Sequence, residues 1–256
     1  EFGSTRSVPP EGIRSLFPDA LLFANDETVV NELDKCRAAR GVAANDETHL
    51  DFSICPTLHC NFRCNYCFEA NQHTTNKMSS ATSRNVVRFA ESFAGAKTIS
   101  VTWYGGEPLV GFSTMQAITA QLQSSRLIFN GAGIITNGFL LTADKIKHLN
   151  GMGITSIQIT LDGPPAIHDS RRHLASGRPT FAKIIENLDA LFASDYSGAC
   201  NIRASIDQSN LADFKELEAF VMSRFAGHNI ALYGGRVERL SGLGTSSCGS
   251  ACGGGK

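Results

Sequence analysis

Three cysteines, Cys60, Cys64 and Cys67, lie within eight residues in the spacing C-x3-C-x2-C. One short loop with this spacing can wrap three thiolates around a single iron–sulfur cluster, which normally takes four cysteine ligands and would here keep one iron open. Two other interpretations compete with the cluster. A zinc site would need a fourth ligand such as Cys55 or His59, and free buried thiols are common in proteins. The crowding of three thiols in a hydrophilic loop favours the cluster.

The composition narrows the classes of partner and compartment. The chain has 256 residues, a formal net charge of −1 and 42% hydrophobic residues, enough for one sizeable core. A near-neutral chain lacks the basic surface that nucleic acid requires, and no run of about 18 apolar residues predicts a membrane span. Residues 1–7 resemble a cloning scar and show no signal peptide. Eight cysteines without an export signal favour metal binding in a reducing, cytoplasmic compartment.

The order of elements indicates an α/β fold. Residues 8–48 form a predicted helical N-terminal extension, and over residues 49–235 strands alternate with helices. This alternation is typical of parallel βαβ units, whose right-handed crossovers would curl the sheet into a partial (β/α)6 TIM-like barrel. Strands are expected at 50–55, 98–104, 132–137, 155–161, 201–207 and 228–233, and helices at 79–94, 113–125, 143–150, 181–193 and 211–225, the last with Asn210 as N-cap.

The predicted strands alternate apolar and polar residues, whereas buried parallel strands normally read as continuous apolar runs. In the fourth strand Ile157 and Ile159 face one side, and Gln158 and Thr160 face the other. Helices must cover the apolar side, so the polar side would line the barrel interior, which is costly unless a polar ligand occupies it. By the same parity Arg203 points inward and needs a partner there, since buried arginine is rarely unpaired. The alternative is a sheet with one face open to water.

Four ordered motifs resemble those of the radical S-adenosylmethionine superfamily, over about residues 50–235. The fourth is similar to the peptide- and protein-modifying branch, whose maturases often carry a SPASM or twitch domain. The motifs are the three-cysteine loop with Tyr66 before its last cysteine, Gly105-Gly106-Glu107-Pro108 after the second strand, Thr136-Asn137-Gly138 after the third, and Gln158 to Gly163 continuing through His168-Asp169 to Arg172.

The resemblance implies a [4Fe–4S] cluster and S-adenosylmethionine as cofactors. Cys60, Cys64 and Cys67 would bind the cluster and thereby carry catalysis. Cys248 and Cys252 resemble the entry to an auxiliary-cluster domain, so residues 236–256 are either a tail or a truncated SPASM or twitch segment. The implied S-adenosylmethionine contacts are Tyr66 near the adenine, Gly105, Gly106 and Glu107 at the methionyl ammonium, Asn137, Thr160 and Asp162 at the ribose or carboxylate, and Arg172 at the carboxylate unless it is a solvated surface residue.

The implied activity is reductive cleavage of S-adenosylmethionine followed by hydrogen abstraction from a ribosomal precursor peptide or a protein, giving a cross-linked or oxidised residue. An electron donor such as flavodoxin or ferredoxin would then be a partner. Among enzymes the alternative is a sulfatase-maturing enzyme that generates formylglycine. From another class, the alternative is a non-catalytic zinc-binding module, which would have no need of the GGEP motif or of Asp162.

Overall fold

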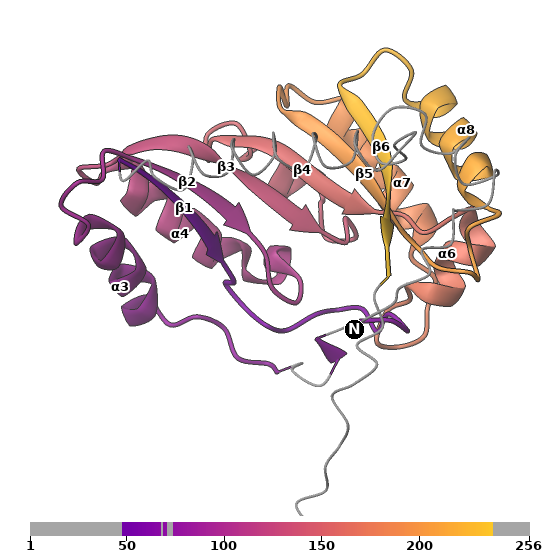
Figure 1. Ribbon diagram of the computed structural model, residues 1–256, viewed down its shortest axis with the longest axis horizontal. Helices are drawn as coiled ribbons and strands as arrows, with labels where there is room; N and C mark the ends of the chain where they lie inside the picture. The colour runs from indigo at the N-terminus through magenta and orange to yellow at the C-terminus, as the bar shows by residue number, and fades with distance from the viewer. Residues whose placement is uncertain (1–47, 68, 71–73, 238–256) are drawn as a thin grey trace, which may run out of the picture.

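The computed structural model of the chain describes residues 48–67, 69–70 and 74–237. The predicted N-terminal extension, apart from its last residue, and both Cys248 and Cys252 lie outside these residues. Among the helices described, none is long and apolar enough to cross a membrane. In chain order the elements are β1 (His49–Ile54), α3 (Ser80–Glu91), β2 (Thr98–Trp103), the 3-10 helix η2 (Pro108–Gly111), α4 (Phe112–Gln123), β3 (Ile128–Thr136), α5 (Ala143–Ile146), β4 (Ile154–Thr160), α6 (Pro165–Arg171), α7 (Phe181–Phe192), β5 (Ala199–Ile206), α8 (Phe214–Arg224) and β6 (Ile230–Arg236) (Figure 1).

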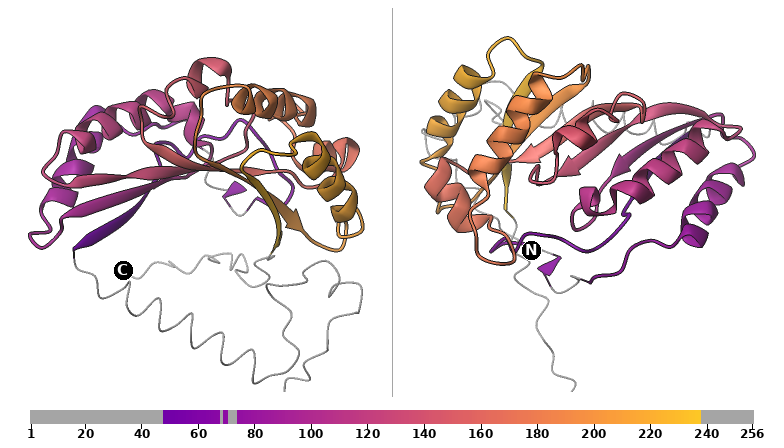
Figure 2. Two further views of the ribbon diagram at one scale, coloured as in Figure 1. Left: turned by 90° about the horizontal axis from the view of Figure 1, so that it is seen from above. Right: turned by 180° about the vertical axis from the view of Figure 1, so that it is seen from behind.

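The strands form one six-stranded sheet in the order β1-β2-β3-β4-β5-β6, and every neighbouring pair is parallel. The sheet is curved, and the helices lie on its convex side (Figure 2, left). This arrangement is a partial TIM-like barrel, as the alternation of strands and helices predicts. Because all strands run the same way, their carboxyl ends meet at one edge, where α/β barrels place their active sites.

The alternation of residues within the strands explains how the sheet packs. Ile157 and Ile159 of β4 are fully buried on the helical side, where Leu188 of α7 is also fully buried. Burial of each such side chain contributes about 1.5–3 kcal/mol. Gln158, between the two isoleucines, instead lines a cavity on the concave side. The polar face of the sheet therefore points inward, as predicted.

Two helices differ from the sequence prediction. The helix expected over 143–150 ends at Ile146, because the chain then tightens into turns in which the His148 amide donates to the Lys145 carbonyl. The helix expected from residue 211 starts at Phe214 and has Asp213, not Asn210, as its N-cap. The side-chain amide of Asn210 instead donates to two backbone carbonyls, those of residues 162 and 205, and so joins the loops after β4 and β5.

A further helix and a longer strand escaped the sequence prediction. Helix α6 begins with Pro165 at its first turn, a position that proline favours because its missing N–H would be unpaired there. It is short, and its helical periodicity is therefore weak. Strand β3 starts at Ile128 rather than at residue 132, and its first part contains Asn130 and Gly131, which are poor strand formers.

Candidate active site

The cysteine loop follows β1 and is fixed against the end of α6 and the residues just after it. The backbone amide of Arg63 donates to the His173 carbonyl at 2.9 Å, and that of Asn65 donates to the Arg171 carbonyl at 3.1 Å. The Arg63 guanidinium also donates to the carbonyls of Cys60 and Phe62. These contacts hold the loop in one shape without using any thiol.

The three predicted cluster cysteines face one cavity. Cys60 is buried and Cys64 and Cys67 are half-buried, and all three are free thiols. Burial raises the pKa of Cys60 to about 12, against a hydrogen bond from the Phe62 amide that lowers it. Among the described residues no group of three or more His, Cys, Asp or Glu side chains is arranged to hold a single metal ion. The three thiols therefore line one cavity but, within the described part of the chain, are not arranged as a ready-made metal site.

The two glycines of the GGEP motif pack against the start of the cysteine loop. Gly105 has φ +112°, and a Cβ there would lie 2.5 Å from the Thr57 carbonyl oxygen. A Cβ on Gly106 would collide with the Leu58 carbonyl. The Glu107 amide donates to the His59 carbonyl. Only glycine lets the loop after β2 approach this closely, so the motif shapes the cysteine loop as well as lining the cavity.

The Glu107 carboxylate joins two loops. It is fully buried and accepts hydrogen bonds from the backbone amides of Leu109 (3.0 Å) and Asn137 (2.8 Å) and from the Thr136 hydroxyl (2.7 Å). Burial raises the pKa of Glu107, and these hydrogen bonds oppose the rise. Asn137 is also engaged by the protein, since its amide donates to Asn61 at 2.8 Å. Both side chains line the cavity, yet their first partners are protein groups.

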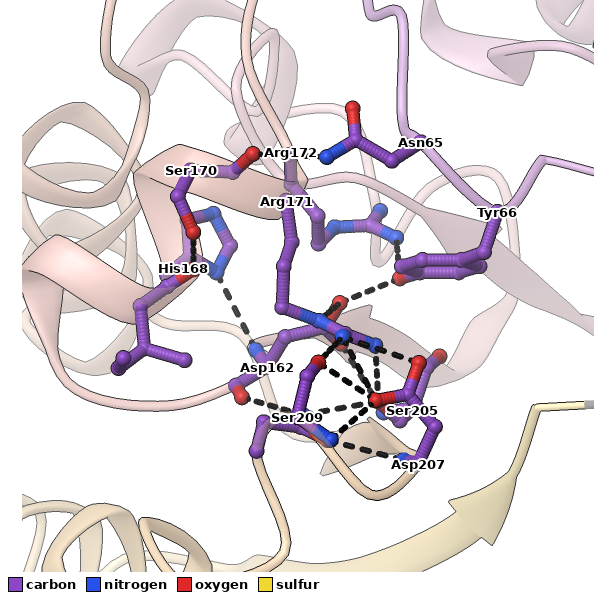
Figure 3. A network of polar contacts seen from close by, with 12 residues as sticks. Asn65, Tyr66, Asp162, His168, Ser170, Arg171, Arg172, Ser205, Asp207 and Ser209 are labelled. Atoms are coloured by element: carbon purple, nitrogen blue, oxygen red, sulfur yellow. Dashed lines mark hydrogen bonds and ion pairs between the residues drawn. The ribbon is translucent and has the colours of Figure 1, made fainter.

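Tyr66 is held by a network of charged groups at the edge of the cavity (Figure 3). Its hydroxyl donates to the Asp162 carboxylate at 2.6 Å and accepts from Arg172 at 2.6 Å. The guanidinium of Arg171 lies 5.0 Å from the centre of the Tyr66 ring. Burial raises the pKa of Tyr66, so its hydroxyl stays protonated at neutral pH. These contacts hold both the hydroxyl and the ring face of Tyr66.

Asp162 and Arg171 form the base of this network. The Asp162 carboxylate accepts from Arg171 at 3.3 Å and from the Ser205 amide at 3.0 Å. Arg171 also donates to Asp207 at 3.1 Å. Neither Asp162 nor Arg171 is among the residues that line the cavity. The expectation that Asp162 contacts the ribose or carboxylate of a cofactor therefore gains no support, and its bonds are those of a positioning residue.

The role of Arg171 escaped the sequence analysis. Arg171 and Arg172 are adjacent, and only one of them could be matched to the motif. The signal that could have identified Arg171 is its place at the end of an amphipathic turn that carries His168, which is also buried. The His168 Nδ1 atom accepts from the Asp162 amide at 3.2 Å, and its Nε2 atom faces the Thr180 hydroxyl at 3.1 Å. Burial, and then the charges of Arg172 and Arg171, lower the pKa of His168.

Arg172 contacts the cysteine loop through Tyr66 and is not a solvated surface residue. Only 9% of it is exposed, it lines the cavity, and it lies over the Phe62 ring. Its Nε atom is buried without a hydrogen-bond partner among the described residues. An orphaned donor on a buried guanidinium costs free energy unless an anion or polar ligand meets it. The cavity is therefore suited to a ligand that carries a negative charge beside the thiols.

The cavity has a volume of about 940 Å³, the size of a small-molecule site. It lies on the concave side of the sheet, toward the carboxyl ends of the strands. Of the residues predicted to bind the cluster or S-adenosylmethionine, those that line it are Cys60, Cys64, Tyr66, Cys67, Gly105, Gly106, Glu107, Asn137, Thr160 and Arg172. The lining also includes Tyr104, which continues the inward polar face of the second strand, and Glu69 and Tyr233, which the strand pattern did not place there.

The chain is similar in sequence to several curated proteins. GTP 3',8-cyclase of Haemophilus influenzae (strain PittEE) is 28% identical over 170 residues, which are 65% of this chain and 47% of that protein. The serine-type anaerobic sulfatase-maturating enzyme of Bacteroides thetaiotaomicron is 27% identical over 142 residues, which are 52% of this chain and 34% of that enzyme. The chain thus spans about half the length, or less, of the curated relatives that it matches.

Solved structures share the fold. Native anSMEcpe with bound AdoMet and Kp18Cys peptide has a TM-score of 0.65 at 19% identity, covering 74% of this chain and 52% of that one. Streptococcus suis SuiB bound to precursor peptide SuiA has a TM-score of 0.54 at 16% identity, covering 89% and 50%. The sequence profile described as the radical SAM superfamily matches residues 54–221, from the end of β1 into α8. The chain therefore belongs to the radical SAM superfamily, a family that implies a [4Fe–4S] cluster and S-adenosylmethionine.

Proposed function

We propose that this chain is a radical SAM enzyme that cleaves S-adenosylmethionine reductively and abstracts hydrogen from a peptide or protein. The proposal depends on one observation. Three free thiols from one loop line the same cavity as the buried Arg172, whose Nε atom has no hydrogen-bond partner among the described residues. Thiolates suit iron–sulfur clusters, and a guanidinium suits the carboxylate of S-adenosylmethionine.

In this proposal Cys60, Cys64 and Cys67 bind the cluster. Three thiolates leave one iron open, where the amino acid part of S-adenosylmethionine would chelate. When bound, the cluster supplies the electron that splits the sulfonium and releases a 5′-deoxyadenosyl radical. The protein must first surrender three thiol protons, because only the thiolate is a metal ligand. The Arg63 contacts fix the loop backbone, and the thiols would have to converge when the cluster binds.

Arg172 would pair with the carboxylate of S-adenosylmethionine. Its burial in the cavity lining favours this role over that of a solvated surface residue. Tyr66 would pack on the adenine, in an orientation set by Asp162 and Arg171. Gly105, Gly106 and Glu107 would meet the methionyl ammonium, and Asn137 and Thr160 would face the ribose or carboxylate; all five line the same cavity. Asp162 acts in the proposal by positioning Tyr66.

The substrate class is proposed from the fold neighbours. The solved structures of anSMEcpe and SuiB contain bound peptides, and this favours a ribosomal precursor peptide or protein over the nucleotide that GTP 3',8-cyclase is named for. A cross-link or an oxidised residue would be the product, with a flavodoxin or ferredoxin as electron donor. A sulfatase-maturing activity is the second candidate, supported by the similarity to the Bacteroides enzyme. Cys248 and Cys252 stay candidates for an auxiliary cluster.

The test is anaerobic reconstitution followed by reduction in the presence of S-adenosylmethionine. The wild-type chain should bind about four irons per three-cysteine site and should release 5′-deoxyadenosine. Cys64→Ala should lose the product, whereas the matched variant Cys55→Ala should keep it, because Cys55 is outside the cavity lining. A colourless protein with one zinc that depends on Cys55 would instead favour the zinc-binding module. Mass spectrometry of candidate precursor peptides then identifies the bond formed.

A further inference from the structure

A second arginine, Arg203, points into the cavity from the middle of β5. Residues on this strand alternate, so that Ile202 and Ala204 are buried toward the helices while Arg203 and Ser205 line the cavity. In the register of the sheet Arg203 lies between Thr160 on β4 and Tyr233 on β6. The guanidinium is therefore presented on the concave face of the sheet, inside the cavity.

The wall behind this guanidinium is built to receive it. A Cβ on Gly235 of β6 would lie 2.5 Å from the Arg203 Nε atom and 2.7 Å from its Nη2 atom. Any side chain at residue 235 would displace the guanidinium, so the arginine lies flat against the backbone of β6. A rigid, flat guanidinium presents its paired donors in one fixed direction, which suits bidentate recognition of an anion.

Arg203 has no protein partner. Across the described residues no hydrogen bond, ion pair or ring contact is made by its guanidinium, in contrast to Arg171, which is bonded to Asp162 and Asp207. Arg203 is half-buried, and the nearest strands offer neutral side chains, including Gln158 and Tyr233. Its guanidinium is therefore available for charge-assisted hydrogen bonds to an anionic ligand.

Arg172 and Arg203 lie on different sides of the cavity. Arg172 donates to the Tyr66 hydroxyl and lies over the Phe62 ring, both in the cysteine loop. Arg203 is on β5, which pairs with β6 at the opposite edge of the sheet from β1, the strand that the cysteine loop follows. Arg172 thus belongs to the thiol half of the cavity, whereas Arg203 belongs to the half formed by β5 and β6.

We propose that Arg203 binds a carboxylate of the peptide substrate, in the half of the cavity formed by β5 and β6. The inference rests on the proposed function, which assigns Arg172 and the thiols to the cofactors and leaves this half to the substrate. Arg236 of β6 also lines the cavity, and the Glu69 carboxylate in the same cavity offsets one of these positive charges, so the site suits a single carboxylate rather than a polyphosphate. The carboxylate comes from an aspartate or glutamate side chain or from a free C-terminus.

The experiment compares peptide binding to the reconstituted full chain with S-adenosylmethionine present, by calorimetry. The probes are blocked pentaglycine peptides with a central aspartate, asparagine, phosphoserine or lysine, an unblocked pentaglycine with a free C-terminus, and GTP. The wild type should bind the aspartate peptide at least about ten-fold more tightly than the asparagine peptide, as expected of charge-assisted hydrogen bonds. Preference for the free C-terminus over aspartate would identify that source of the carboxylate.

The variants decide whether Arg203 carries the preference. Arg203→Gln should abolish it, Arg203→Lys should keep part of it, and Arg203→Glu should transfer it to the lysine peptide. The matched variant Arg88→Gln removes an equal charge from the exposed face of α3 and should bind as the wild type does. Inversion by Arg203→Glu also shows that the variants are folded.

Three results would overturn the inference: no preference for aspartate in the wild type, a preference that survives Arg203→Gln, or an Arg203-dependent preference for phosphoserine or GTP. Release of 5′-deoxyadenosine by the wild type is measured separately. Its absence would sink the proposed function whatever the peptides show, whereas its presence without an Arg203-dependent preference would sink this inference alone.

Discussion

Replacing Asp162 by asparagine should destabilise the protein and release Tyr66. The carboxylate accepts from the Tyr66 hydroxyl, from Arg171 and from the Ser205 amide, and all three partners are donors. Asparagine keeps the shape of the side chain but turns one acceptor into a donor. Whichever way the new amide is oriented, its NH2 group meets at least one of these donors, and one buried group is left unpaired.

The structure sets the size of this effect. The side chain of Asp162 is 0% exposed and that of Arg171 is 9% exposed. Removing one partner of a buried ion pair costs about 3–5 kcal/mol when the other charge stays uncompensated. Arg171 keeps Asp207 at 3.1 Å, so the expected loss in the free energy of unfolding is at the lower end, about 3 kcal/mol. Asp207 is more exposed, and Asp207→Asn should cost no more than about 1 kcal/mol.

Urea unfolding of the full chain under reducing, anaerobic conditions measures both losses. A double-mutant cycle with Tyr66→Phe adds the coupling between phenol and carboxylate, expected at about 1.5 kcal/mol or more for a hydrogen bond to a charged group. Equal losses in the free energy of unfolding for Asp162→Asn and Asp207→Asn would refute the reasoning. They would show that the deeper burial of the Asp162–Arg171 pair does not increase the cost of breaking it. A coupling of zero would show that Tyr66 does not depend on Asp162.

Two further predictions concern the His168 imidazole, which bonds to the Asp162 amide, and Gly105, whose turn shapes the cysteine loop. Burial lowers the pKa of His168 in the folded chain, so only the unfolded chain takes up a proton there below about pH 6.5. The free energy of unfolding should therefore fall as the pH drops through this range, by up to about 1.4 kcal/mol per pH unit, and His168→Gln should lack this part of the slope in unfolding curves recorded from pH 7.5 downward. Gly105→Ala should sharply lower the iron content after reconstitution, since its Cβ would meet the Thr57 carbonyl at 2.5 Å, whereas Gly177→Ala, at φ +80° with open space around it, should leave iron content near that of the wild type. Equal iron content in both glycine variants would contradict the packing argument.

The sequence determines the fold through short-range patterns. The alternation in β4 and β5 predicts both the helical and the inward face, because side-chain parity is fixed within a strand. The position of the thiols at the carboxyl end of β1 follows from the same order of elements. The helix expected over 143–150 fails because local turn bonds replace the helical ones after Ile146.

The site contains features that no local pattern encodes. Arg171 and Arg172 are neighbours in sequence, yet Arg171 turns to Asp162 while Arg172 turns to the cavity. That choice is made by partners on other elements, Asp207 after β5 and Tyr66 in the cysteine loop. The space that Gly105 preserves is likewise filled by the Thr57 carbonyl, from a segment distant in the chain. Contacts of this kind become visible only when the sheet brings its loops together.

The same contacts link the two halves of the cavity. Asp162 follows β4 and accepts from the cysteine loop through Tyr66 and from β5 through the Ser205 amide. Ser205 is two residues beyond Arg203 on the same inward face. A shift of β5 that accompanies ligand binding at Arg203 would therefore strain the acceptor on which Tyr66 depends. The Asp162 carboxylate thus connects the proposed cofactor half to the strand that carries Arg203, so occupancy of one half should change the ligand affinity of the other.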